Sequence, residues 1–269
     1  MTFLYYTKQT TIFQGLLYMN INFARLTIAG ESNTGPIRHH NADNILIYAP
    51  PGGSAVLAAV ADGIGGHSRG EIASRICCRE LLRSAMKCDC AAWDGDFLNR
   101  SLQQINREMF DFNFRSFRLR PMGCTVAAAV FTADKVTFAS AGDSRIYEFC
   151  RNGEGQPLHQ LTTDHRPEGY AELLSTGKIR HLSLVSRSLG TAKHLEVDIR
   201  EKSRPANAVY MLCSDGLYNR LPSQVISGVL GSPLAPRKMV GILVREAMLA
   251  GEKDNISVIC AAPAGKEVQ

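Results

Sequence analysis

The stretch Val56-Leu57-Ala58-Ala59-Val60-Ala61-Asp62-Gly63 runs through six consecutive apolar residues and stops at an aspartate. A short apolar run that ends at a turn signal is typical of a buried strand. The same arrangement, an apolar strand that ends or begins at an aspartate, recurs at Asp143, Asp215 and Asp254. Because core strands carry their terminal side chains to a common edge, these four carboxylates could converge on one site.

Each of these aspartates also has a simpler interpretation, because Asp-Gly is a strong turn signal and a lone aspartate at a strand end is usually a cap. Carboxylates that lie close together repel one another and raise one another's pKa unless cations neutralise them. Oxygen ligands without accompanying histidine or cysteine favour Mg²⁺ or Mn²⁺ over zinc. The pattern alone leaves the turn and the metal site open as alternatives.

The order of the predicted elements indicates the fold class. Short β-branched or apolar segments predict strands over Asn22–Ala29, Asn44–Tyr48, Ala55–Ala61, Thr125–Phe131, Val136–Ala141, Ser144–Phe149, Ala208–Cys213 and Ile256–Ala261. Apolar residues at spacings of three and four predict helices over Glu71–Met86, Phe97–Phe114 and Arg237–Ala250. Strands and helices that cluster separately favour an α+β fold with antiparallel sheets over a doubly wound parallel sheet.

The chain reads as a single domain. Its 269 residues can bury a substantial core, and no repeat or linker divides them. Residues 1–18 are interpreted as an N-terminal extension, with Met19 as a candidate natural start, and residues 19–269 as the domain. The least regular segment, 164–190, is expected to border a site.

Composition narrows the classes of partner. A net charge of +5 without a dense Lys/Arg block argues against nucleic acid. No apolar run reaches the roughly 18 residues of a membrane-spanning helix, so no membrane partner is expected. Eight scattered cysteines without a C-x-x-C pair indicate reduced thiols and therefore a cytoplasmic location.

Several blocks, in this order and spacing, resemble the metal-dependent protein phosphatases of the protein phosphatase 2C family in its bacterial form. They are Arg38-His-His-Asn41-Ala-Asp43-Asn, Val60-Ala-Asp62-Gly63-Ile-Gly65-Gly66, Gly70-Glu-Ile-Ala-Ser74, Gly123-Cys-Thr125, Ala141-Gly142-Asp143-Ser144-Arg145, Thr163-Asp164-His165, Ser188-Leu-Gly190, Ser214-Asp215-Gly216-Leu217 and Asp254-Asn255-Ile-Ser-Val. The resemblance implies a four-layer α-β-β-α sandwich, in which helix pairs flank two antiparallel sheets. It also implies that the segment 164–190 is a flap beside the site.

The resemblance assigns roles at a site for two Mn²⁺ or Mg²⁺ ions. It implies that Asp62 bridges both ions and that the carbonyl of Gly63 binds one of them. Asp215 and Asp254 would complete the shell of the other ion, and Asp43 would lie in the outer shell.

The resemblance also implies the chemistry. Arg38 would hold the substrate phosphate through its planar fork of donors, while a water shared by the ions and held at Asp62 would attack phosphorus. Asp143 resembles a ligand of a third, weaker metal. The activity expected is hydrolysis of phosphoserine and phosphothreonine in proteins, opposing a Ser/Thr kinase, by a monomeric enzyme.

Three departures from the family pattern leave alternatives open. Ala42 replaces a glutamate, Ile64 replaces a histidine of eukaryotic relatives, and Asn219 replaces an aspartate expected at a third metal. Ala42 and Asn219 favour a regulatory pseudophosphatase, whereas the intact Asp62 and its partners argue against one. A dedicated anti-sigma-factor-type regulator with poor general turnover is a further alternative. A metal-dependent nuclease is disfavoured, because the chain lacks a basic groove.

Overall fold

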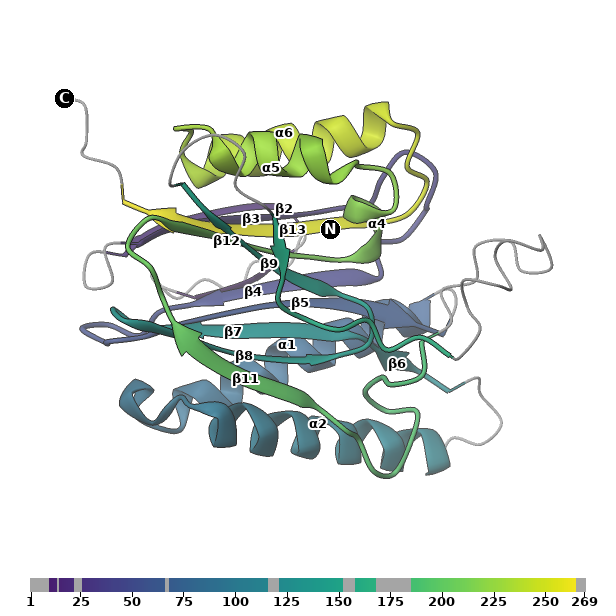
Figure 1. Ribbon diagram of the computed structural model, residues 1–269. Coiled ribbons are helices and arrows are strands. Elements are labelled where there is room, and N and C mark those ends of the chain that lie inside the picture. The colour runs from purple at the N-terminus through teal and green to yellow at the C-terminus, as the bar shows by residue number, and fades with distance from the viewer. Residues whose placement is uncertain are drawn as a thin grey trace.

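The computed structural model describes residues 10–13, 15–21, 26–65, 68–115, 121–151, 158–167 and 185–264. Two antiparallel sheets lie face to face, and helices cover both outer faces (Figure 1). The predicted four-layer α-β-β-α sandwich is therefore confirmed. Among the described helices, none is long and apolar enough to cross a membrane.

The first sheet contains the apolar segment that ends at Asp62 and Gly63. Its strands follow the order β1-β4-β5-β7-β8-β11, and the short β6 pairs with the end of β5. The bounds are β1 Thr10–Phe13, β4 Asp43–Tyr48, β5 Val56–Ile64, β6 Gly123–Cys124, β7 Val126–Phe131, β8 Lys135–Ala141 and β11 Asp198–Ser203. The central strands β4, β5 and β7 are buried almost throughout, as continuous apolar runs require.

The second sheet has the order β10-β9-β12-β13-β3-β2. Its strands are β2 Gly15–Ile21, β3 Leu26–Asn33, β9 Arg145–Cys150, β10 His159–Gln160, β12 Ala208–Cys213 and β13 Ile256–Pro263. The neighbouring strands β12 and β13 are both buried, and each adjoins one of the predicted aspartates.

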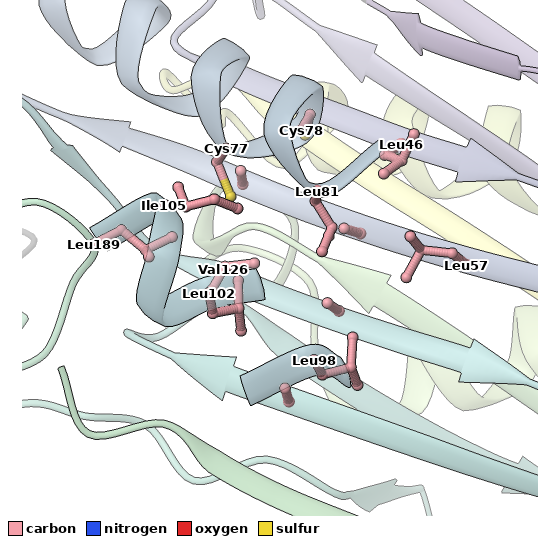
Figure 2. Close-up of a cluster of buried hydrophobic side chains, with 14 of the residues drawn as sticks. Leu46, Leu57, Cys77, Cys78, Leu81, Leu98, Leu102, Ile105, Val126 and Leu189 are labelled. Atoms are coloured by element: carbon pink, nitrogen blue, oxygen red, sulfur yellow. The ribbon is translucent and has the colours of Figure 1, made fainter. Parts of the chain in front are cut away.

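Helices pack on the outer face of each sheet (Figure 1). On the first sheet lie α1 Ser68–Met86 and α2 Gly95–Arg115, with a short 3₁₀ helix Cys90–Ala92 between them. On the second lie α4 Asp215–Tyr218, α5 Ser223–Gly231 and α6 Pro236–Leu249. Figure 2 shows Cys77, Cys78 and Leu81 of α1 directed into a cluster that also receives Leu98, Leu102 and Ile105 of α2.

Some elements were not expected from the sequence. They are β1, β2, β6, β10, β11, α4, α5 and the 3₁₀ helix Cys90–Ala92. Residues 10–13 of β1 and 15–18 of β2 belong to the segment interpreted as an extension, and the two strands pair with β4 and β3 respectively. The structure thus places residues 10–13 and 15–21 in the two sheets, while a natural start at Met19 stays a prediction.

Candidate metal centre

Asp43 and Asp62 are paired residues on adjacent strands. The register of β4 and β5 sets Asp43 opposite Asp62 at one end of the first sheet. Thr125 fixes the backbone of Asp62: its N–H donates to the Asp62 carbonyl at 2.8 Å, and its Oγ1 accepts from the Asp62 N–H at 3.3 Å. The sheet itself therefore brings these two carboxyl-bearing residues together.

The other two predicted aspartates come from the second sheet. Asp215 begins α4 just after β12, and Asp254 lies just before β13, the strand paired with β12. Ser214 joins the sheets, since its Oγ donates to Oδ2 of Asp43 at 2.6 Å. The structure thus brings Asp43, Asp62, Asp215 and Asp254 to the same end of the sandwich.

The carboxylates share an environment that disfavours their charges. Burial raises the pKa of Asp43 to about 7, although hydrogen bonds from Ser214 and Ser257 lower it and the charges of Asp215 and Asp254 raise it further. When the whole residue is considered, Asp62 is half-buried. Its carboxyl is nevertheless enclosed, and burial followed by the charge of Asp43 raises its pKa well above the ordinary value. Such a cluster carries an electrostatic cost that a cation would offset.

Gly63 lies at a backbone-to-backbone contact with the start of α1. A Cβ added to Gly63 would come within 2.0 Å of the carbonyl oxygen of Gly70, and one added to Gly70 would come within 2.5 Å of the carbonyl oxygen of Gly63. The Gly63 N–H donates to the carbonyl of Ala42 at 3.1 Å. Glycine is required here because of close approach, and the contact fixes the backbone directly after Asp62.

Arg38 reaches the carboxylates from the loop between β3 and β4. One guanidinium nitrogen donates to Oδ2 of Asp254 at 2.7 Å. Partial burial acts to lower the pKa of Arg38, but the hydrogen bond to Asp254 and the charges of Asp254, Asp62 and Asp215 outweigh it and raise the pKa. The Arg38 side chain remains 57% exposed, so a ligand in solution can reach it.

Asn255 holds the loop that carries Arg38. Its Nδ2 donates to the carbonyls of Thr34 at 2.8 Å and His40 at 3.0 Å, and its Oδ1 accepts from the N–H of Ala42 at 2.8 Å. These bonds fix both ends of the loop to the residue that follows Asp254.

Asp143 joins the cluster from the turn between β8 and β9. It is buried, and Oδ2 lies 3.1 Å from Nη2 of Arg166. Burial and the charge of Asp215 raise the pKa of Asp143 to about 6, while Arg166 lowers it. Next to it, Arg145 donates two hydrogen bonds of 2.9 and 2.7 Å to the Asp164 carboxylate.

The residues that depart from the family pattern make backbone or neutral contacts. The N–H and C=O of Ala42 bond to Asn255 and Gly63. The Asn219 amide donates to Oδ2 of Asp215 at 3.1 Å, so Asn219 adds no negative charge. Most of the segment 164–190, which the resemblance implies is a flap beside the site, lies outside the described residues.

The chemistry of the donor set fits divalent cations that prefer oxygen, because the cluster offers carboxylates without cysteine or histidine ligands. In the described part of the chain, however, no three His, Cys, Asp or Glu side chains already surround one point as a finished cage would. Asp254 is paired with Arg38, and Asp43 with Ser214. Mg²⁺ and Mn²⁺ sites of this kind keep several water ligands, so the residues present fit ions held by few protein atoms.

Three contributors to this site were not identified from the sequence. Ser214, Asn255 and Arg166 act through contacts that join the two sheets or link distant loops. Ser214 and Asn255 do flank predicted aspartates inside recurring motifs, which is the signal that could have found them. Nothing comparable marks Arg166.

Comparison with known proteins places this arrangement in a family. A family model described as protein phosphatase 2C matches residues 39–230. The serine/threonine phosphatase stp of Listeria monocytogenes is 31% identical over 241 residues, covering 85% of this chain and 92% of the relative. The chain belongs to the protein phosphatase 2C family, which confirms the family and the class of enzyme predicted from its motifs.

Two solved structures agree with the fold. The serine/threonine phosphatase of S. agalactiae has a TM-score of 0.76 and 27% identity, covering 88% of this chain and 99% of that one. The catalytic domain of the serine threonine protein phosphatase PstP, solved in complex with two manganese ions, has a TM-score of 0.70 and 28% identity, covering 88% and 97%. The particular relatives of this chain are thus bacterial serine/threonine phosphatases.

Proposed function

We propose that this chain is a metal-dependent protein serine/threonine phosphatase whose site lies where the two sheets meet. The observation that carries the proposal is the hydrogen bond from Ser214 to Asp43, because it ties the Asp43–Asp62 pair of one sheet to the Asp215–Asp254 pair of the other. Names of relatives in three bacterial genera support the substrate class.

The carboxylates are the residues that would hold two Mn²⁺ or Mg²⁺ ions. Asp62 would bridge them, the Gly63 carbonyl would bind one, and Asp215 and Asp254 would bind the other. When bound, such ions lower the pKa of a shared water and neutralise charge on the phosphoryl group. The two manganese ions of the PstP catalytic domain support this stoichiometry.

The remaining roles belong to the chain's own side chains. Asp43, fixed by the Ser214 hydroxyl and with a pKa near 7, would orient water from outside the ligand shell. Arg38 would hold two phosphate oxygens in its guanidinium fork, which suits paired oxygens better than an ammonium. Its contact with Asp254 places that fork beside the cluster.

The partner would be a phosphoprotein, and the reaction would oppose a Ser/Thr kinase in the same cell, with the enzyme acting as a monomer. All eight cysteines are free thiols, which supports a reducing, cytoplasmic compartment. The four aspartates Asp43, Asp62, Asp215 and Asp254 are all present at one end of the sandwich and argue against the rival interpretation as a pseudophosphatase, which rests on Ala42 and Asn219.

The test is hydrolysis of a phosphothreonine peptide and of p-nitrophenyl phosphate by the full chain with Mn²⁺, with Mg²⁺ and with EDTA. Asp62→Asn is the test variant, and Asp111→Asn, an exposed aspartate of α2, is the matched control. We expect turnover that EDTA and Asp62→Asn abolish and Asp111→Asn preserves. Binding of Mn²⁺ without turnover on either substrate would count against a general phosphatase and would favour the pseudophosphatase or the regulator with a single dedicated protein substrate.

A further inference from the structure

Asp143, the candidate ligand of a third ion, has a cationic side chain as its neighbour. Nη2 of Arg166 lies 3.1 Å from Oδ2 of Asp143, and both side chains are largely buried, at 20% and 3% exposed. An ion pair with so little solvent around it is screened only weakly. The charge of Asp143 is therefore already matched by a residue of the chain.

The position of Arg166 is fixed by the backbone that precedes it. The N–H of His165 donates to the carbonyl of Gly142 at 3.0 Å, and the N–H of Gly142 donates to Nδ1 of His165 at 3.1 Å. Two opposed hydrogen bonds thus tie His165 to the residue before Asp143. Because Arg166 directly follows His165, this backbone pairing places Arg166 beside Asp143.

Other groups hold the guanidinium of Arg166 in place. Nη2 donates to the hydroxyl of Tyr218 at 3.0 Å, and that hydroxyl donates to the main-chain carbonyl of Asp143 at 2.8 Å. Nε lies 3.6 Å from Oδ2 of Asp164, whose carboxylate is held by Arg145. A guanidinium with this many partners is costly to displace.

On the Asp215 side of this region, Asn219 does not supply the carboxylate that the family pattern places there. Asn219 faces Asp215 with its amide nitrogen, at 3.1 Å from Oδ2, and so offers that carboxylate a donor. Asp143 and Asp215 are close enough for the charge of one to raise the pKa of the other. Each of these two carboxylates therefore has a nitrogen donor as a neighbour. A divalent cation beside Arg166 would be repelled by the positive charge of the guanidinium.

We propose that Arg166 takes the place of a third metal ion at Asp143, so that this enzyme works with two divalent cations and a built-in guanidinium. The residues present do not fit the third ion that the family resemblance suggested. This inference rests on the proposed two-metal function. Arg166 acts as a positioning residue through its contacts with Asp143, Asp164 and Tyr218.

The experiment measures the number of Mn²⁺ ions bound by the full chain, by isothermal titration calorimetry and by equilibrium dialysis, up to millimolar metal. Wild type, Asp143→Asn and the double variant Arg166→Ala/Asn219→Asp are compared, with circular dichroism to verify folding. We expect two ions in wild type, an unchanged two in Asp143→Asn, and a third, weaker ion in the double variant. Arg166→Lys is the control that keeps the charge, and it should bind two.

The outcomes separate this inference from the proposed function. Three ions in wild type, falling to two in Asp143→Asn, would overturn the role of Arg166 while leaving the phosphatase intact. A folded double variant that still binds two ions at millimolar Mn²⁺ would show that Arg166 does not exclude the third. Absence of any bound Mn²⁺ in wild type would instead reject the metal-dependent function.

Discussion

Neutralising Asp43 should stabilise the metal-free protein, that is, the protein kept in EDTA. The folded-state pKa of Asp43 is about 7, against an ordinary value of 3.8. An acid whose folded pKa is raised keeps its proton in the folded chain at pH values where the unfolded chain has lost it. Stability therefore falls as pH rises between these two values and stays reduced above the higher one.

The size of this effect follows from the shift. At about 1.4 kcal/mol per pKa unit, the cost of an ionised Asp43 at pH 8 has an upper limit of about 4 kcal/mol. Asp43→Asn keeps the shape of the side chain and an oxygen to accept from Ser214, so it removes the charge with little else. In EDTA at pH 8 we expect a gain of about 2–4 kcal/mol, or on the order of 5–10 °C in melting temperature.

Urea denaturation at two pH values checks the cause of this gain. Near pH 4.5 the wild-type carboxyl is protonated in the folded state, so the advantage of Asp43→Asn should shrink to about 1 kcal/mol or less. With Mn²⁺ present, wild type should gain more stability than the variant, because ions that bind only the folded state stabilise it. Asp111→Asn on α2 is the exposed control and should shift stability by less than about 0.5 kcal/mol. Equal or lower stability of Asp43→Asn at pH 8 in EDTA would refute the reasoning.

Three further substitutions test other parts of the site. Arg38→Lys keeps the charge but loses the fork, so kcat/KM on a phosphothreonine peptide should fall about 10²-fold; steady-state kinetics in Mn²⁺ would contradict this by showing unchanged values. Gly63→Ala places a methyl 2.0 Å from the carbonyl oxygen of Gly70, so the melting temperature should drop by the equivalent of about 3 kcal/mol or more, and a wild-type melting curve would exclude the close approach. Asn255→Ala removes three hydrogen bonds that hold the Arg38 loop, at a cost of about 2–4 kcal/mol by urea denaturation; a loss below about 0.5 kcal/mol would show that the loop is held by other contacts.

The centre of the fold could be predicted from the sequence because its strands are continuous apolar runs. β5, β7 and β12 are buried over nearly their whole length, so composition and turn residues mark them. β11 was missed because it is an edge strand whose side chains are mostly half-buried or exposed. Its sequence, Asp-Ile-Arg-Glu-Lys-Ser, resembles a polar loop, and only pairing with β8 makes it a strand.

Asp62, Asp215 and Asp254 could be recognised as candidates because a strand that ends or begins at an acidic residue leaves a local pattern, whereas Asp43 was indicated by the family resemblance. The residues that surround these aspartates could not be predicted in this way. Ser214 contacts a residue 171 positions away, and Asn255 contacts the Arg38 loop across 213 to 221 positions. Such contacts depend on how two sheets are stacked, which no local pattern records. The pairing of Arg166 with Asp143 links the β8–β9 turn to the loop after β10, and no local pattern records it either.

Because both sheets contribute to the proposed site, its residues are synthesised in a fixed order. Asp43 and Asp62 leave the ribosome early, whereas Asp254 and β13 follow nearly 200 residues later, at about 5–20 residues per second. A nascent chain therefore holds half of the proposed ligands for many seconds without their partners. Because the proposed site needs residues of both sheets, we expect no Mn²⁺-dependent phosphatase activity before β13 has been synthesised and has joined the second sheet.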